Sequence, residues 1–173
     1  MIPEINRILC ATDLSDNSDY VMRYAINSAR KYDAGIIILH VLEPLSGTAN
    51  ALVLPYLSEV KEKKVLEEKI AYAKEKIQQR LKAFCEKEFK NDPESVNTVE
   101  SIELCEGFPA EMILRKTDEL NCDAIVMGSH GKGFIRNTFL GSTSKRVLRR
   151  TRKPVFIIPL PKEEADIGLS DLD

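Results

Sequence analysis

The chain has 173 residues and a formal net charge of −2, and 43% of its residues are hydrophobic. This size and composition favour one globular domain over a disordered or membrane-spanning protein, and the small net charge gives no reason to expect nucleic acid or an anionic membrane as a partner. The four cysteines are far apart, which is typical of a reducing compartment, and the first residues lack the pattern of a secretory signal. We therefore expect a cytoplasmic protein.

The first part of the chain reads as strand, helix, strand. Residues 7–12 form an apolar run typical of a strand buried on both faces, and residues 36–42 form a second one. Between them, apolar residues recur at helical spacing from the cap candidates at 15–18 to the stop signal at 33–35. Residues 43–50 have loop composition. The apolar segment 52–57 is interpreted as a loop packed on the core, with a ligand flap or a subunit contact as alternatives.

The middle of the chain is dominated by one long helix. Charged residues fill the solvent side of residues 58–90, and the apolar residues follow steps of three and four. The apolar positions are Leu66, Ile70, Ala73, Ile77, Leu81 and Phe84. A weak alternation predicts a third strand over residues 96–104. A third helix then opens at residues 107–111, with Pro109 near its first position, and runs to about Leu120.

The last third predicts a strand at residues 124–127, a long loop, a helix at 142–150 and a fifth strand at 154–158. Five strands that alternate with four helical segments predict an α/β fold, a three-layer, doubly wound, Rossmann-like parallel sheet. Residues 1–161 are predicted to be a single domain, and the acidic residues 162–173 a flexible tail.

Glycines and hydroxyl residues are concentrated after the fourth strand. Two residues separate Gly128 from Gly131, and nine separate Gly131 from Gly141, which Ser142 follows at the expected helix start. The intervals match neither the P-loop nor the dinucleotide fingerprint. Glycines let a phosphate approach the backbone, and a helix N-terminus presents free N–H groups to an anion. This stretch therefore predicts an anion site.

The spacing of these glycines resembles the ATP-binding motif of the universal stress protein family. The resemblance extends over residues 8–15, 35–41, 123–131 and 153–158, which are similar to the first, second, fourth and fifth strands of that family. It implies the strand order 3-2-1-4-5, ATP as the ligand with Mg²⁺ or Mn²⁺ bound through its phosphates, and a homodimer that pairs through residues 154–158. It also implies that the residues matching Asp13, Val41, Gly128, Gly131, Gly141 and Ser142 contact the nucleotide.

In this strand order the sheet reverses direction between the first and fourth strands, and ligands of such sheets bind at the carboxyl ends of the strands there. We expect Gly131, Gly141 and Ser142 to offer backbone amides to phosphates, and Asp13 to accept from a ribose hydroxyl or face a metal ion through water. Lys132, Arg136 and Lys145 could raise the local potential. The complete set of predicted nucleotide-binding residues is Ala11, Thr12, Asp13, Val41, Met127, Gly128, Gly131, Gly141, Ser142, Thr143 and Ser144.

Alternatives remain for the single residues and for the function. In the alternative interpretation Asp13 does no more than cap the following turn, His130 is a surface residue, and His40 is a core residue whose hydrogen bonds are satisfied. An adenine-nucleotide-binding regulatory protein of stress responses, acting through a protein partner, is the first interpretation. The second is a slow ATPase or nucleotidyl transferase, although no catalytic set of residues stands out. The third is a scaffold that binds no nucleotide.

Overall fold

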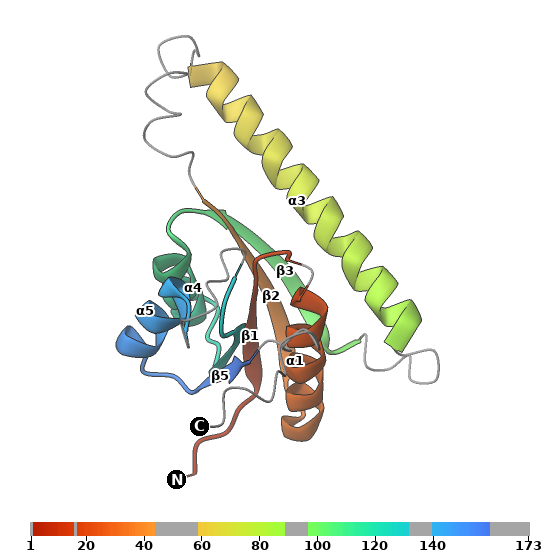
Figure 1. Ribbon diagram of the computed structural model, residues 1–173, viewed down its shortest axis with the longest axis vertical. Coiled ribbons are helices and arrows are strands. Elements are labelled where there is room, and N and C mark those ends of the chain that lie inside the picture. Colours follow the sequence, from red (N-terminus) through yellow and green to blue (C-terminus); the bar gives the residue numbers. More distant parts are fainter. Residues whose placement is uncertain (1, 16, 44–58, 89–96, 132–139, 160–173) are drawn as a thin grey trace, which may run out of the picture.

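The structure of the protein is a computed structural model that describes residues 2–15, 17–43, 59–88, 97–131 and 140–159 (Figure 1). Strands and helices alternate along the chain. In order they are β1 (Arg7–Thr12), α1 (Ser18–Tyr32), β2 (Gly35–Leu42), α3 (Glu59–Glu88), β3 (Val99–Glu106), α4 (Pro109–Glu119), β4 (Ala124–Gly128), α5 (Ser142–Arg150) and β5 (Val155–Ile158).

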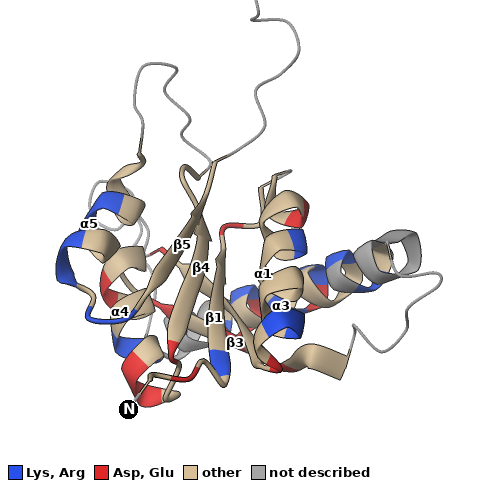
Figure 2. Cartoon of the chain, turned by 90° about the horizontal axis from the view of Figure 1, so that it is seen from below, with Lys and Arg blue, Asp and Glu red and all other residues tan. Residues whose placement is uncertain are grey.

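The five strands form a single parallel sheet in the order β3-β2-β1-β4-β5, as predicted. Helices α1 and α3 cover one face of the sheet, and α4 and α5 cover the other (Figures 1 and 2). In the centre of the sheet, Ala11 of β1 lies between Leu39 of β2 and Met127 of β4. The carboxyl ends of these three strands therefore meet at one edge, where the sheet changes its direction of winding.

Two apolar cores lie on the two faces of the sheet. Alternate side chains of β1 separate them, since Ile8 and Cys10 pack toward α1 and α3 while Leu9 packs toward α4 and α5. All three of these side chains are at most 1% exposed. The predicted burial of β1 on both faces is therefore confirmed for its central residues, and a parallel sheet buried in this way reads as a continuous apolar run.

The boundaries of the third strand differ from the sequence prediction. The third strand spans Val99–Glu106 instead of 96–104, and it pairs with β2 as far as Leu42 and Glu106. As an edge strand with half-buried side chains it carries a weak apolar alternation, so its ends could not be read from the pattern. The first helix begins at Ser18 with Asn17 at its cap position, inside the predicted cap region 15–18, although Asn17 makes no side-chain capping bond.

Helix α3 contacts the body of the protein through its second half. Of its predicted apolar face, Ala73 and Ile77 are 4% and 3% exposed, whereas Tyr72 on the same helix is 66% exposed. Figure 1 shows the beginning of α3 extending away from the sheet. The side chains of Leu66, Leu81 and Phe84 lie outside the described residues.

Several predictions concern residues that the structure does not describe. These are the segment 52–57, the basic side chains of Lys132 and Arg136 and the tail 162–173. The extent of the domain, residues 1–161, likewise stays a prediction. None of the helices in the described ranges combines the length and the apolar character that crossing a membrane requires.

Candidate functional site

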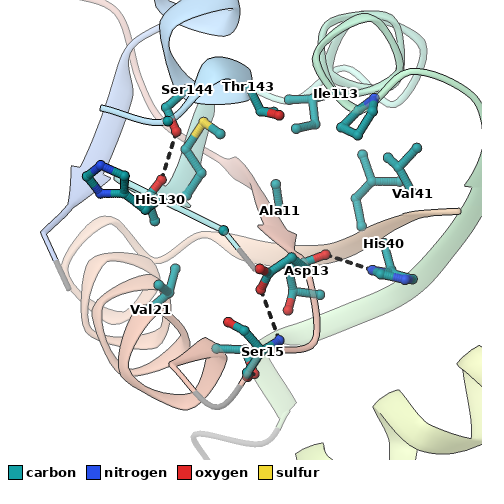
Figure 3. Close-up of a pocket in the computed structure, with 18 of the residues that line it drawn as sticks. Ala11, Asp13, Ser15, Val21, His40, Val41, Ile113, His130, Thr143 and Ser144 are labelled. Carbon is teal, nitrogen blue, oxygen red and sulfur yellow. Dashed lines mark hydrogen bonds between the residues drawn. The ribbon is translucent and has the colours of Figure 1, made fainter. Parts of the chain in front are cut away.

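A cavity of about 460 Å³ opens at the carboxyl edge of β1, β2 and β4 (Figure 3). This volume lies in the range of small-molecule and cofactor sites. All eleven residues of the predicted nucleotide site line this cavity, although they come from β1, β2, β4 and the start of α5. The structure thus brings the predicted residues together at one place, and their contact with a ligand stays a prediction.

Asp13 follows the last residue of β1 and lies at the centre of the cavity (Figure 3). Its Oδ1 atom accepts a hydrogen bond from the backbone N–H of Ser15 at 3.0 Å, so the predicted turn-capping role is present. Its Oδ2 atom is buried and has no hydrogen-bond partner among the described residues. A buried acceptor without a partner costs about 1–3 kcal/mol, which a donor on a ligand would recover. The carboxylate can therefore cap the turn with one oxygen and bind a ligand with the other.

Gly131 leaves the space above this carboxylate open. A Cβ atom placed on Gly131 would lie 3.0 Å from Asp13 Oδ2, which is closer than such atoms normally come. The loop backbone after β4 and the Asp13 side chain are thus neighbours, as the strand order predicts. A residue with a side chain at this position would cover the unpartnered Oδ2 atom of Asp13.

The start of α5 presents backbone donors to the cavity. The first intrahelical hydrogen bond runs from the N–H of Lys145 to the carbonyl of Gly141. The N–H groups of Ser142, Thr143 and Ser144 precede that bond, and none of them has a partner among the residues that the structure describes. These groups and the positive end of the helix dipole favour an anion.

The predicted phosphate contact of the Gly141 amide needs correction, and the Ser144 hydroxyl is also engaged within the protein. The backbone N–H of Gly141 donates to the carbonyl of Ser129 at 2.8 Å, so this amide closes the loop and is not available to a phosphate. The buried hydroxyl of Ser144 donates to the carbonyl of Gly128 at 3.0 Å (Figure 3). Both residues hold the end of β4 against the start of α5, and the three N–H groups of the helix start keep no partner among the described residues and can serve an anion.

Two histidines lie at the cavity, and each has a bond to its surroundings. His40 is 7% exposed, and its Nδ1 atom lies 2.8 Å from the carbonyl oxygen of Thr12. This confirms the interpretation of His40 as a satisfied core residue, and the bond fixes the end of β1 just before Asp13. The Nδ1 atom of His130 lies 3.1 Å from the hydroxyl of Ser129. Cys10 lies at the bottom of the cavity, where burial raises the pKa of its thiol to about 12, so it stays protonated.

The wall between β2 and α4 is apolar. Val41, Leu39 and Ile113 line it together with Pro109 at the first turn of α4. An apolar wall on one side and backbone donors with a carboxylate on the other suit a molecule with a flat apolar part, hydroxyl groups and an anionic part.

Some residues of the cavity were not predicted. They lie in the loop before α1, in the first turn of α1 and in α4, and include Ser15, Asn17, Ser18, Val21, Pro109 and Ile113. The signal that could have found them is the rule already used for β4, because each helix that follows a parallel strand begins at the carboxyl edge of the sheet.

The fold and the site together define an α/β protein with a cavity at the switch point of a parallel sheet, bordered by the start of α5. The model of the Universal stress protein family matches residues 4–159, and the chain therefore belongs to this family. It is 29% identical over 160 residues to Universal stress protein MJ0531 of Methanocaldococcus jannaschii, with 91% of this chain and 84% of that protein covered.

Solved structures agree with the fold. Universal stress protein UspA from Lactobacillus plantarum has a TM-score of 0.67 at 22% identity, with 91% of this chain and 99% of that chain covered. A universal stress protein from Archaeoglobus fulgidus, solved in complex with dAMP, has a TM-score of 0.53 at 22% identity, with 91% and 99% covered. At these identities the likeness shows the fold alone.

Proposed function

We propose that this protein binds ATP in the cavity at the carboxyl edge of the sheet and acts as a regulatory protein of stress responses. The observation that carries the proposal is the arrangement around a single cavity of a buried carboxylate oxygen on Asp13 and the N–H groups that begin at Ser142, none of which has a partner among the described residues. The complex of the Archaeoglobus fulgidus family member with dAMP supports an adenine nucleotide as the class of ligand.

Each part of ATP has a complementary wall in this proposal. The adenine ring would lie against Val41 and Ile113, and Asp13 Oδ2 would accept a hydrogen bond from a ribose hydroxyl. The phosphates would accept from the N–H groups of Ser142 and Thr143, with the dipole of α5 behind them. Each charge-assisted hydrogen bond contributes about 1.5–3 kcal/mol, so three or four of them could hold the phosphates without a lysine.

The phosphates would also carry the metal ion in this proposal. Within the described ranges, no three His, Cys, Asp or Glu side chains are grouped so that they could hold a metal ion. Mg²⁺ favours a site made of phosphate oxygens, water and one or two carboxylates, and Asp13 could contact it through water. We therefore propose that Mg²⁺ or Mn²⁺ enters with the nucleotide.

Regulatory binding is favoured here over rapid turnover. Phosphoryl transfer needs groups that position a nucleophile and neutralise the developing charge. His40 Nδ1 and His130 Nδ1 contact Thr12 O and Ser129 Oγ, so these nitrogens serve the protein scaffold. We expect ATP hydrolysis to be very slow.

We further propose a cytoplasmic homodimer that pairs through β5. This strand is at the edge of the sheet, and Val155, Phe156 and Ile157 are only half-buried within the chain. Antiparallel pairing across a twofold axis would cover this edge. Light scattering coupled to size-exclusion chromatography should give the mass of a dimer, and Ile157→Lys should give that of a monomer.

Nucleotide extraction tests the function. Freshly purified protein is denatured, and the supernatant is chromatographed for adenine nucleotide, alongside calorimetric titration of nucleotide-free protein with ATP and Mg²⁺. Thr143→Asp places a carboxylate among the N–H groups of the helix start, where it stabilises the helix but repels phosphate. Asn27→Asp adds the same charge to an exposed position of α1 away from the cavity.

We expect the wild type and Asn27→Asp to bind ATP. We expect Thr143→Asp to lose ATP binding but to keep the thermal stability of the wild type. Equal ATP binding by all three proteins would exclude the α5 start as the phosphate site. An absence of ATP binding by the wild type would favour the nucleotide-free scaffold.

A further inference from the structure

Arg80, on the inner side of α3, holds the loop that carries Asp13. Its Nη1 atom donates to the carbonyl of Leu14 at 2.8 Å, to the carbonyl of Ser15 at 2.7 Å and to the hydroxyl of Ser18 at 3.0 Å. The two residues that follow Asp13 in the chain are therefore held through their backbone by a cation from a helix more than sixty positions later. Charge-assisted bonds of this kind are among the stronger hydrogen bonds in proteins.

The loop between β1 and α1 needs such support because its backbone is unusual. Leu14 has a φ angle of 59°, a left-handed conformation that a leucine adopts at a cost. Its N–H donates to the hydroxyl of Thr12, and the N–H of Ser15 donates to Asp13 Oδ1. In this turn the N–H groups bond to side chains that line the cavity, and the carbonyls bond to Arg80 of α3. The same turn that orients the Asp13 carboxylate therefore presents its carbonyls to Arg80.

The apolar packing around this contact is incomplete. A small cavity of about 20 Å³ lies between Leu14, Ile77 and Arg80. Ala73 and Ile77 dock α3 on the sheet, and Arg80 follows Ile77 by one helical turn. Leu14 also packs against the apolar cluster that contains Ile77, but a gap remains beside the loop, so the guanidinium bonds are the polar connection that the described residues show between α3 and the turn after Asp13.

We propose that Arg80 is a positioning residue of the nucleotide site, and that it makes nucleotide binding at Asp13 and the docking of α3 stabilise each other. This inference rests on the proposed function for its ligand. Without Arg80 the Leu14 turn relaxes, and Asp13 Oδ2 is no longer held in the direction of the ligand. Coupling between two sites is reciprocal, so a ligand bound at Asp13 must hold α3 more firmly on the body.

The test compares Arg80→Ala with Lys74→Ala, which removes a positive charge from an exposed position of the same helix. ATP affinity is measured by calorimetry, and amide hydrogen exchange is followed in residues 12–18 and 73–80 with and without ATP. We expect Arg80→Ala to bind ATP roughly tenfold more weakly, a loss of about 1.4 kcal/mol, and Lys74→Ala to bind as the wild type does. ATP should slow exchange in residues 73–80 of the wild type and of Lys74→Ala, but not of Arg80→Ala.

Arg80→Lys keeps the charge on a shorter side chain and should weaken ATP binding less than Arg80→Ala does. If Arg80→Ala does not fold, Arg80→Lys is used in its place. Unchanged ATP affinity in Arg80→Ala, or slowed exchange of α3 by ATP in that variant, would overturn the inference. A merely structural role would lower the melting temperature and leave both of these readouts as in the wild type.

Hydrogen exchange measured without ATP separates this inference from the proposed function. If the wild type binds no ATP, the proposed function fails, while the claim about the loop is still decided by hydrogen exchange alone. Faster exchange of residues 12–18 in Arg80→Ala than in Lys74→Ala would then support the positioning role of Arg80. Equal exchange in the two variants would refute it.

Discussion

Asp13→Asn separates the two roles that the structure gives to this side chain. The Oδ1 atom accepts from the N–H of Ser15, and an asparagine oxygen can take over that bond. The Oδ2 atom, which is buried without a partner among the described residues, would become an NH₂ group that donates instead of accepting. If the amide is flipped, the ligand regains its acceptor but the N–H of Ser15 loses its own.

The expected changes in unfolding free energy and in ATP affinity differ, because the substitution keeps the bond to Ser15 and removes the bond to the ligand. In the ligand-free protein the substitution keeps the turn and removes a buried, unpartnered charged oxygen, so the free energy of unfolding should change by no more than about 1 kcal/mol. In the complex it removes a hydrogen bond to a charged acceptor, worth about 1.5–3 kcal/mol. This loss corresponds to an ATP affinity that is about 10- to 150-fold weaker.

Urea denaturation without ligand and calorimetric titration with ATP measure the two quantities on the same samples. Asp118→Asn, which makes the same change at an exposed position of α4, serves as the control and should alter neither. If Asp13→Asn binds ATP as tightly as the wild type, Asp13 is not a ligand and only caps its turn. If Asp13→Asn lowers the free energy of unfolding by well over about 1 kcal/mol, the unpartnered Oδ2 atom does not destabilise the ligand-free protein.

Three further predictions concern the cavity, the opposite edge of the sheet and the core. Gly131→Ala should weaken ATP binding by about tenfold, because the new Cβ would lie 3.0 Å from Asp13 Oδ2; calorimetry showing unchanged affinity would refute this. Asp123→Ala should lower the unfolding free energy in urea by about 1–3 kcal/mol, since two backbone N–H groups lose their acceptor, but it should leave ATP binding intact. Burial raises the pKa of Cys10 to about 12 and that of Cys122 to about 11, so alkylation at pH 8 should require unfolding. Stability should also fall as pH rises above the ordinary thiol value of 9.0, because the unfolded chain loses those protons first; a flat profile would contradict it.

The fold was predictable because its core strands are continuous apolar runs. Ile8, Leu9 and Cys10 follow one another, all buried, and no alternative element accommodates such a run as well as a central parallel strand. The edge strand β3 was less predictable, since it pairs on one side only and its side chains are half-buried. The order of the strands came from the family resemblance, because periodicity alone does not determine which strands are neighbours.

The location of the site was predictable from the sequence, but the hydrogen bonds that its individual donor and acceptor atoms make were not. The glycine spacing pointed to the loop and to α5, yet it could not show that the Gly141 N–H is bonded to Ser129 or that the Ser144 hydroxyl is bonded to Gly128. The contacts of Arg80 were equally hidden, because a charged residue on a long helix reads as part of a solvated surface. Hydrogen bonds between distant segments depend on the folded backbone, and the sequence pattern does not contain them.

The pairing of β1 with β4 has a consequence for the synthesis of the protein. These adjacent strands are far apart in the sequence, so Ala11 meets Met127 only after the residues of β4 have left the ribosome. Contacts of such long range form late in folding. A nascent chain that ends before β4 therefore has only part of the cavity lining, and the complete cavity forms only after β4 and the start of α5 have been synthesised.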